Sequence, residues 1–399
     1  MKISRKNIPD GMRDMLFGET KTVKELSCIT EEVFRDRGYG EVVTPGLEYY
    51  DVFNFENQVI PEENMFKLTD TTGKLAVLRP DNTTPIARIV SSRLKNATFP
   101  VKLYYCQNVF RISRDYSGKR SEFMQTGIEI IGGDTMRSDM ESVLCALEAL
   151  DKIRDYFGGK LSFKLEIGHV GYYKALIEQM KLSEEQQEKV RKYVEAKNSF
   201  SMGAFELENS EDFRTIQKIP TLFGTGEVFS KARTLAGENI KALGALSYLN
   251  DIYNSLCVAG YSEDITIDLA IAHSIEYYTG FVFRAYLEYA GEPVLSGGRY
   301  DMLYKNFDMD KGATGFGINL SIISDAAQKR QLVKPDKKAE FVLYFEMPYL
   351  KKAIDYAKKS GKIHEFSTYE DYDKTLEYAK AKGIGKVVCV GKEIKEIIL

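Results

Sequence analysis

Polar and charged side chains gather in residues 110–133, which read FRISRDYSGKRSEFMQTGIEIIGG. The first half of this stretch carries four cations, namely Arg111, Arg114, Lys119 and Arg120. The second half carries Gln125 and Glu129 on either side of Gly127, and on a strand these three residues share one face. Guanidinium groups pair with carboxylates, and a carboxylate pairs with an ammonium, so the stretch could hold a small zwitterion. A strand whose polar face lies against solvent would show the same composition.

The residues on both sides of the loop predict an antiparallel hairpin that would position these groups. Residues 103–110 are rich in β-branched and aromatic side chains, residues 115–118 carry turn chemistry, and residues 123–131 form a second apolar run. In the return strand Thr126, Ile128 and Ile130 alternate with the polar residues. One face of the hairpin is therefore expected to be polar and the other to join the core.

Upstream of the hairpin, the pattern predicts a helix over 20–37 that Gly38 ends, and then a strand over 41–44 that Pro45 breaks. Short strands are predicted over 66–68 and 75–78. They lead into LRPDNTTPIARIVSSRL, where a helix is predicted over 86–94. Asp81 precedes this helix and could cap it through its carboxylate, a role that is compatible with binding a ligand.

Downstream of the hairpin, an amphipathic helix is predicted over 138–157 and a strand over 161–167. His169 follows that strand and is interpreted as a loop-end residue rather than a ligand. Residues 172–263 are predicted to be a helical insertion with a capping box at Ser183 and Gln186, after which residues 265–271 alternate as a strand. The remaining expected elements are strands over 341–345, 364–366 and 387–390 and helices over 350–359 and 372–382.

The composition narrows the class of protein. The 399 residues carry 55 Lys and Arg against 58 Asp and Glu, so the charge balance neither requires a nucleic-acid partner nor excludes one. The five cysteines are scattered without a C-x-x-C pair, and the three histidines are dispersed, so no metal centre, disulfide framework or cofactor is expected. No apolar stretch approaches the length of a membrane span, and the N-terminus lacks the apolar core of a signal peptide. These features predict a cytoplasmic protein.

The central stretch resembles motif 2 of the class II aminoacyl-tRNA synthetases, and within them that of the histidyl-tRNA synthetases. The matching residues are Arg111, Gly118, Phe123, Gln125, Gly127 and Glu129. LRPDNT resembles the synthetase segment Leu-Arg-Pro-Glu-Gly-Thr, and YYTG at 277–280 matches a histidine-specific segment. The resemblance implies an α+β fold with an antiparallel sheet flanked by helices. It also implies a histidine-binding site made of Asp81, Thr83, Arg111, Gln125, Glu129, Tyr277 and Tyr278.

Three departures fall where the synthetases bind and activate ATP. Ser113 replaces a glutamate that contacts adenine, His273 replaces the catalytic arginine, and Ile322 replaces the arginine of motif 3. The groups assigned to histidine are largely kept. This combination resembles the regulatory subunits of ATP phosphoribosyltransferase, which implies a chain without catalytic residues of its own that activates a short catalytic subunit and takes part in histidine feedback.

This pattern leaves two alternatives open. The first is a degenerate histidyl-tRNA synthetase or histidine-activating enzyme, and the second is a stand-alone histidine sensor.

Residues 38–45 resemble motif 1, the dimer-forming element of the class II enzymes, and imply a homodimer inside a larger hetero-oligomer. We expect a synthetase-like core over 1–333 that includes the insertion, followed by a lobe over 334–399. The lobe resembles a truncated anticodon-binding domain, and we expect it not to bind tRNA.

Overall fold

The computed structural model describes residues 5–55, 60–112, 120–195, 210–270 and 278–399. The chain divides into two compact units, Met1–Val333 and Lys334–Leu399. Each unit has its own sheet and its own hydrophobic core.

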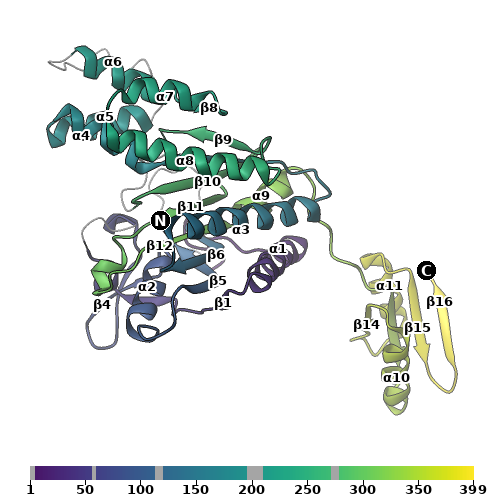
Figure 1. Cartoon of the computed structure of the whole chain (residues 1–399). Coiled ribbons are helices and arrows are strands. Elements are labelled where there is room, and N and C mark those ends of the chain that lie inside the picture. Colours follow the sequence, from purple (N-terminus) through teal and green to yellow (C-terminus); the bar gives the residue numbers. More distant parts are fainter. Residues whose placement is uncertain (1–4, 56–59, 113–119, 196–209, 271–277) are drawn as a thin grey trace. The chain divides into compact units, whose positions relative to one another are not determined.

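A nine-stranded sheet forms the centre of the first unit (Figure 1). From edge to edge its strands are β1 (Gly40–Glu41), β5 (Val101–Phe110), β6 (Glu122–Ile131), β12 (Ala313–Asn319), β11 (Leu295–Arg299), β10 (Phe281–Leu287), β7 (Phe163–His169), β9 (Ile265–Asp268) and β8 (Phe223–Gly224). Every pair from β5 to β7 is antiparallel, whereas β1 pairs with β5, and β7 with β9, in parallel. The predicted α+β class with an antiparallel sheet is confirmed, and so is the hairpin of β5 and β6.

The two faces of this sheet differ in chemistry. The surrounding helices are α1 (Phe17–Asp36), α3 (Thr135–Tyr156), α9 (Leu320–Lys329) and α2 (Thr83–Ser92). Ile128 and Ile130 of β6 join the core cluster that contains Phe34 of α1 and the buried stripe of α3. On the opposite face, Ile86 of α2 clusters with Tyr105 of β5. One face is thus apolar and covered by helices, and the other carries the polar residues of β6.

The segment between β7 and β9 is mostly helical, in agreement with the pattern of residues 172–263. It contains α4 (Val170–Met180), α5 (Glu184–Glu195), α6 (Ser210–Lys218), α7 (Val228–Ala236) and α8 (Ile240–Val258). The predicted capping box is present, because Ser183 N donates to Gln186 Oε1 at 2.9 Å and Gln186 N donates to Ser183 Oγ at 3.3 Å. The two-residue strand β8 was not predicted, since two residues offer no alternation from which a strand can be inferred.

A separate three-stranded sheet lies between β1 and α2 in the sequence. It is formed by β2 (Leu47–Tyr49), β4 (Leu75–Leu78) and β3 (Lys67–Thr69) in that order. The two short strands predicted here are confirmed. Among the described residues, no helix combines the length and the apolar character needed to cross a membrane.

The second unit is a four-stranded sheet with two helices. Its strands run in the order β14 (His364–Phe366), β13 (Phe341–Phe345), β15 (Lys386–Val390) and β16 (Ile394–Ile398), with helices α10 (Leu350–Ser360) and α11 (Tyr372–Lys382). All the elements predicted for this unit are present. The edge strand β16 was not predicted, and its side chains are largely exposed, so it lacks the buried alternation that indicates a strand.

Candidate functional site

The polar face of the sheet is lined by glycines where β6 meets β12. Glu129 pairs with Gly315, Gly127 with Gly317, and Gln125 with Asn319. A Cβ atom on Gly315 would lie 2.5 Å from Glu129 Oε2, and one on Gly317 would lie 2.7 Å from Gln125 Nε2. The glycines of β12 therefore leave the space into which the Gln125 and Glu129 side chains extend.

Among the predicted site residues that the structure describes, Glu129 is the most deeply buried, with 1% of its surface exposed. Its Oε1 accepts a hydrogen bond from Thr83 Oγ1 at 2.7 Å, whereas its Oε2 is buried and has no hydrogen-bond partner. Burial raises the pKa of Glu129 well above its ordinary value, and the nearby Asp81 carboxylate raises it further. The structure thus brings Thr83 and Glu129, two of the predicted site residues, into direct contact.

Asp81 caps α2 although Asn82 is the residue that directly precedes the helix. Asp81 Oδ1 accepts from Thr84 N at 2.7 Å, and its Oδ2 accepts from Thr84 Oγ1 at 3.1 Å. Burial raises the pKa of Asp81, and this is opposed by the Thr84 hydrogen bonds and by the charge of Arg111. The capping role considered for Asp81 is therefore present, and it holds the carboxylate beside Thr83 and Glu129.

Gln125 is held by two neighbours that the sequence did not single out. Its Oε1 accepts from Asn82 Nδ2 at 3.1 Å and from the Tyr105 hydroxyl at 3.3 Å. Tyr105 lies directly opposite Gly127 in the register of β5 and β6. The alternation along β5 could have identified Tyr105, because it places this residue on the polar face.

Arg111 lies at the end of β5 and contacts the segment that carries Asp81. Its Nε donates to the Pro80 carbonyl oxygen at 2.7 Å, and its guanidinium lies 5.4 Å from the centre of the Phe123 ring. The charge of Arg111 favours the ionised form of Asp81. Arg111 thus belongs to the same cluster as the acidic residues.

Tyrosines surround the buried carboxyl of Glu129. Tyr278 is buried, and it packs in the cluster that also contains Tyr105, Tyr300 and Tyr304. The Tyr304 hydroxyl is buried without a hydrogen-bond partner, and burial together with the charge of Glu129 raises the pKa of this phenol. Tyr300 and Tyr304 were not singled out in the sequence, although Tyr300 lies within the segment SGGRYD at 296–301 and Tyr304 follows Tyr300 four residues later. Tyr277 lies outside the described residues.

These contacts define what the cluster can bind. The cluster combines the buried carboxyl groups of Asp81 and Glu129, both of raised pKa, with the Gln125 amide and several tyrosine hydroxyls. Glu129 Oε2 and the Tyr304 hydroxyl have no hydrogen-bond partner. A ligand that brings a positive charge or N–H donors would satisfy these groups. Within the described part of the chain, no group of three or more His, Cys, Asp or Glu residues could hold a metal ion.

The position where the synthetases carry the motif 3 arginine has a different role here. Ile322 lies in the first turn of α9, and its side chain packs against the main core cluster. Asn319 caps this helix, since its Oδ1 accepts from Ile322 N at 3.1 Å. Ser113 and His273, the other two departures, lie outside the described residues.

Comparison with known proteins places the chain in a family. A family model described as histidyl-tRNA synthetase matches residues 11–323. The chain is 38% identical to an ATP phosphoribosyltransferase regulatory subunit of Clostridium botulinum (strain 657 / Type Ba4), over 98% of this chain and 93% of that protein. It is also 38% identical to the protein of that name from Clostridium acetobutylicum, over 98% of this chain and 97% of the relative. The chain belongs to the family of ATP phosphoribosyltransferase regulatory subunits.

Solved structures place this regulatory-subunit family on the synthetase fold. The crystal structure of an ATP phosphoribosyltransferase regulatory subunit/histidyl-tRNA synthetase from Bacillus halodurans C matches with a TM-score of 0.84 at 31% identity, covering 98% of this chain and 100% of that chain. A histidyl-tRNA synthetase from Nostoc sp. PCC 7120 matches with a TM-score of 0.77 at 21% identity, covering 100% of this chain and 97% of that chain, and so shares the fold. The resemblance inferred from the sequence is therefore confirmed.

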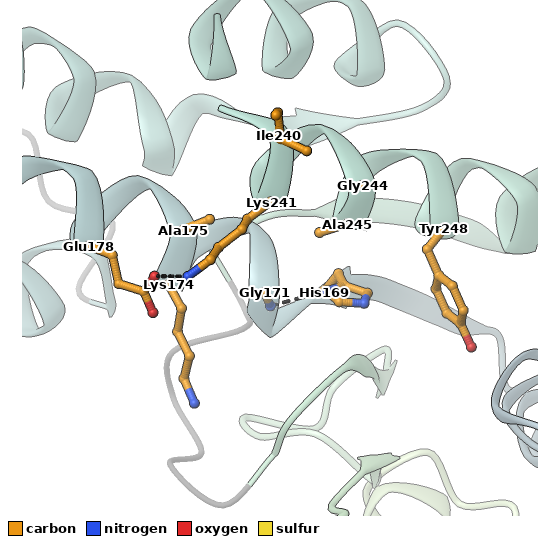
Figure 2. Close-up of a pocket in the computed structure, with 10 residues that line it drawn as sticks. All are labelled: His169, Gly171, Lys174, Ala175, Glu178, Ile240, Lys241, Gly244, Ala245 and Tyr248. Atoms are coloured by element: carbon orange, nitrogen blue, oxygen red, sulfur yellow. Dashed lines mark hydrogen bonds and ion pairs between the residues drawn. The ribbon is translucent and has the colours of Figure 1, made fainter. Parts of the chain in front are cut away.

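This member of the regulatory-subunit family also has a pocket of about 410 Å³ between α4 and α8, which we call the α4–α8 pocket (Figure 2). Its lining includes His169, Gly171, Lys174, Lys241, Gly244 and Tyr248. His169 ends β7 and begins α4, where its Nδ1 accepts from Gly171 N at 3.1 Å. The sequence had indicated a loop-end residue, and the structure adds that the imidazole forms one wall of a pocket.

Proposed function

We propose that the chain is a regulatory subunit that binds a separate catalytic ATP phosphoribosyltransferase subunit and is required for its activity. The observation that carries this proposal is the 38% identity, over nearly the whole chain, to proteins of that name. In this role the chain contributes to the first step of histidine biosynthesis without performing the transfer itself.

The chain is proposed to have no synthetase activity of its own. Adenylation of an amino acid builds negative charge on phosphorus, and the loss of one preorganised donor at such a centre typically costs about 100- to 1000-fold in rate. Ile322 stands where the synthetases have an arginine, and its side chain is directed into the core cluster. A packed isoleucine cannot neutralise a phosphate.

We further propose that free histidine binds in the cluster around Glu129. The amino group would lie by Asp81 and Thr83, and the Gln125, Glu129 and Tyr278 side chains would surround the rest of the molecule. Support comes from the two buried carboxyl groups and from the Glu129 Oε2 atom, which lacks a partner. Feedback would then require that histidine binds one state of the assembly more tightly than another.

The proposed assembly contains a homodimer of this chain and no tRNA. The dimer would use the element over 20–45, which includes α1 and β1, in an isologous interface. The second unit is proposed to stabilise the assembly rather than to read an anticodon. A gel-shift assay that finds selective binding of histidine tRNA would contradict that part of the proposal.

The central experiment has two arms. The purified chain is mixed with a short-form catalytic ATP phosphoribosyltransferase, and formation of phosphoribosyl-ATP is followed for each protein alone and for the mixture. In parallel, histidine-dependent pyrophosphate exchange is measured for the chain alone. We expect activity only in the mixture and no exchange.

The two arms separate the alternatives. The Bacillus halodurans protein is described as both a regulatory subunit and a histidyl-tRNA synthetase, which keeps a degenerate synthetase or histidine-activating enzyme as the second candidate. Robust exchange by the chain alone would establish that candidate. If neither arm shows activity while calorimetry detects histidine binding, the stand-alone sensor remains.

A further inference from the structure

The α4–α8 pocket has no part in the proposed function, yet it presents an open hydrogen-bond donor. His169 Nδ1 accepts from Gly171 N, so the proton of the neutral ring lies on Nε2. No described residue accepts a hydrogen bond from Nε2. Burial lowers the pKa of His169 to about 4, so the ring stays neutral and keeps this single donor near neutral pH.

The rim of the pocket has an excess of positive charge. Lys241 of α8 forms an ion pair with Glu178 of α4, with an N–O distance of 2.8 Å (Figure 2). Lys174 also lines the pocket, and its ammonium makes no ion pair with any residue that the structure describes. Two ammonium groups and one carboxylate therefore line the pocket, and the surplus positive charge favours an anionic ligand.

The wall opposite Lys174 is held in place by a buried network. The Tyr248 hydroxyl donates to Asp139 Oδ2 at 2.7 Å, and Asp139 is paired with Arg299 at 2.9 Å. The rings of Tyr248 and His169 meet edge to face, with centroids 5.5 Å apart. Because this wall is fixed before any ligand arrives, binding costs little rearrangement.

On its α8 side the pocket has empty space next to Gly244. A Cβ atom built on Gly244 meets no other atom within 4 Å, so the space over this residue is empty. The volume of about 410 Å³ lies in the range of pockets that hold small organic ligands.

We propose that the α4–α8 pocket is a binding site for a small organic anion whose carboxylate or phosphate accepts a hydrogen bond from His169 Nε2 and pairs with Lys174. The body of the ligand occupies the space over Gly244, beside the Tyr248 ring. This site lies on the helix-covered face of the sheet, opposite the face that carries Gln125 and Glu129, because His169 is in register with Phe281 of the apolar face.

The histidine ring itself provides the readout. The chain contains three histidines, so the imidazole ¹⁵N spectrum of the full-length protein is simple, and His169 is assigned by the signal that is lost in His169→Gln. Ribose 5-phosphate and succinate are titrated separately, to distinguish a phosphate ligand from a carboxylate ligand. We expect at least one of them to shift the His169 Nε2 resonance in a saturable manner while the His364 resonance stays unchanged.

Two variants locate the binding site. Gly244→Leu fills the pocket, and Lys174→Gln removes the unpaired charge; each is expected to weaken probe binding by about tenfold or more, since a hydrogen bond to a charged group is lost or blocked. Lys189→Gln on the exposed face of α5 is the matched control and is expected to bind like the wild type. Gly244→Leu should keep or raise the melting temperature, because leucine favours a helix interior more than glycine does.

The titrations of the wild type and the variants decide whether the α4–α8 pocket binds an anion. Saturable binding that both pocket variants weaken and the control does not establishes the site. The proposal is wrong if neither probe shifts the His169 signal at 10 mM, or if the shift is equally strong in Gly244→Leu and Lys174→Gln.

Discussion

At the scale of single residues, the cluster around Glu129 is organised by the cost of burying carboxyl groups. Asp81 is held by the start of α2, whereas Glu129 has one accepted hydrogen bond and one oxygen without a partner. A buried carboxylate without full hydrogen bonding favours its protonated form. In the free chain the buried Glu129 Oε2 therefore lacks a hydrogen-bond partner, which is unfavourable. A ligand with a positive charge or an N–H donor would supply that partner.

The raised pKa of Glu129 predicts a specific dependence of stability on pH. A group whose folded pKa lies above its unfolded value stabilises the folded chain fully below the unfolded pKa, and this contribution is lost as the pH rises through the folded pKa. Relative to Glu129→Gln, we expect the free energy of unfolding of the wild type to fall as the pH rises above 4.5. The expected slope is about 1.4 kcal/mol per pH unit between the unfolded and the folded pKa of Glu129. Urea unfolding at several pH values measures this difference, and parallel curves for the two proteins would contradict it.

The same carboxyl is predicted to contribute to histidine affinity. Glu129→Ala leaves a polar group of the ligand unmatched in a buried site, which typically costs about 1–3 kcal/mol, or roughly ten- to a hundredfold in the dissociation constant. Calorimetry measures the change. Glu122→Ala on the other face of β6, where Asn108 Nδ2 donates to Glu122 at 2.7 Å, is the control and should bind histidine normally. Unchanged affinity in Glu129→Ala would move the ligand to another site, such as the interface with the partner subunit.

At the scale of elements, the site depends on how β6 and β12 pair. The register sets Glu129 against Gly315 and Gln125 against Asn319. A shift by one residue would turn Gln125 and Glu129 to the apolar face and place Thr126 and Ile128 on the polar face. The glycines of β12 matter because each lies beneath one of the site's side chains.

Gly315 tests this dependence. A Cβ atom on Gly315 would overlap the Ile128 carbonyl oxygen and would lie 2.5 Å from Glu129 Oε2. We expect Gly315→Ala to lower the free energy of unfolding by about 1–3 kcal/mol and to weaken histidine binding, since the strands must separate and the Glu129 carboxyl must move. The control is Gly291→Ala, outside both the site and the proposed dimer element, where a Cβ atom would meet no other atom within 4 Å. Equal stability of the two variants, measured by denaturant unfolding, would contradict the argument.

At the scale of the whole molecule, exposed apolar side chains gather in and after the element proposed to form the dimer. The set comprises Val43, Leu47, Tyr49, Leu68 and Leu75. Single exposed apolar residues are common on protein surfaces, but a group of them on one face marks an interaction surface. Leu47, Tyr49 and Leu68 lie on one face of the sheet of β2, β4 and β3, since Tyr49 and Leu68 both pair with Ala76, whereas Leu75 lies on the other face.

Light scattering tests the homodimer directly. The wild type is expected to have twice the mass of one chain at micromolar concentration. Val43→Asp, at a residue that is 72% exposed, should shift the protein to the monomer, because a buried unpaired charge is costly at an interface. Val258→Asp, at a residue of α8 that is 91% exposed, should leave the dimer intact. A monomeric wild type, or a Val43→Asp protein that stays dimeric, would contradict the proposed interface.

Much of this protein could be read from its sequence, because its signals are local. The alternation in β5 and β6, the helical spacing in α1 and α3, and the Ser183 capping box each depend on residues close together in the chain. Motif matches added the synthetase fold and the hypothesis that Asp81, Thr83 and Glu129 bind one ligand. Several strands were not predicted, among them β2, β10, β11 and β12. For β8 and β16 the reason is that neither has a buried alternating face.

Only the tertiary structure decided how these parts meet. Tyr105, Tyr304 and Asn82 entered the site because strand register and the packing of α2 brought them to Gln125 and Glu129. The raised pKa of Glu129 is likewise a property of burial, since the same carboxyl on an exposed strand would be solvated. The pocket that His169 shares with α8 joins residues about 75 positions apart in the chain. Hydrogen bonds, burial and cavities are set by residues distant in sequence, so they become visible only when the chain is folded.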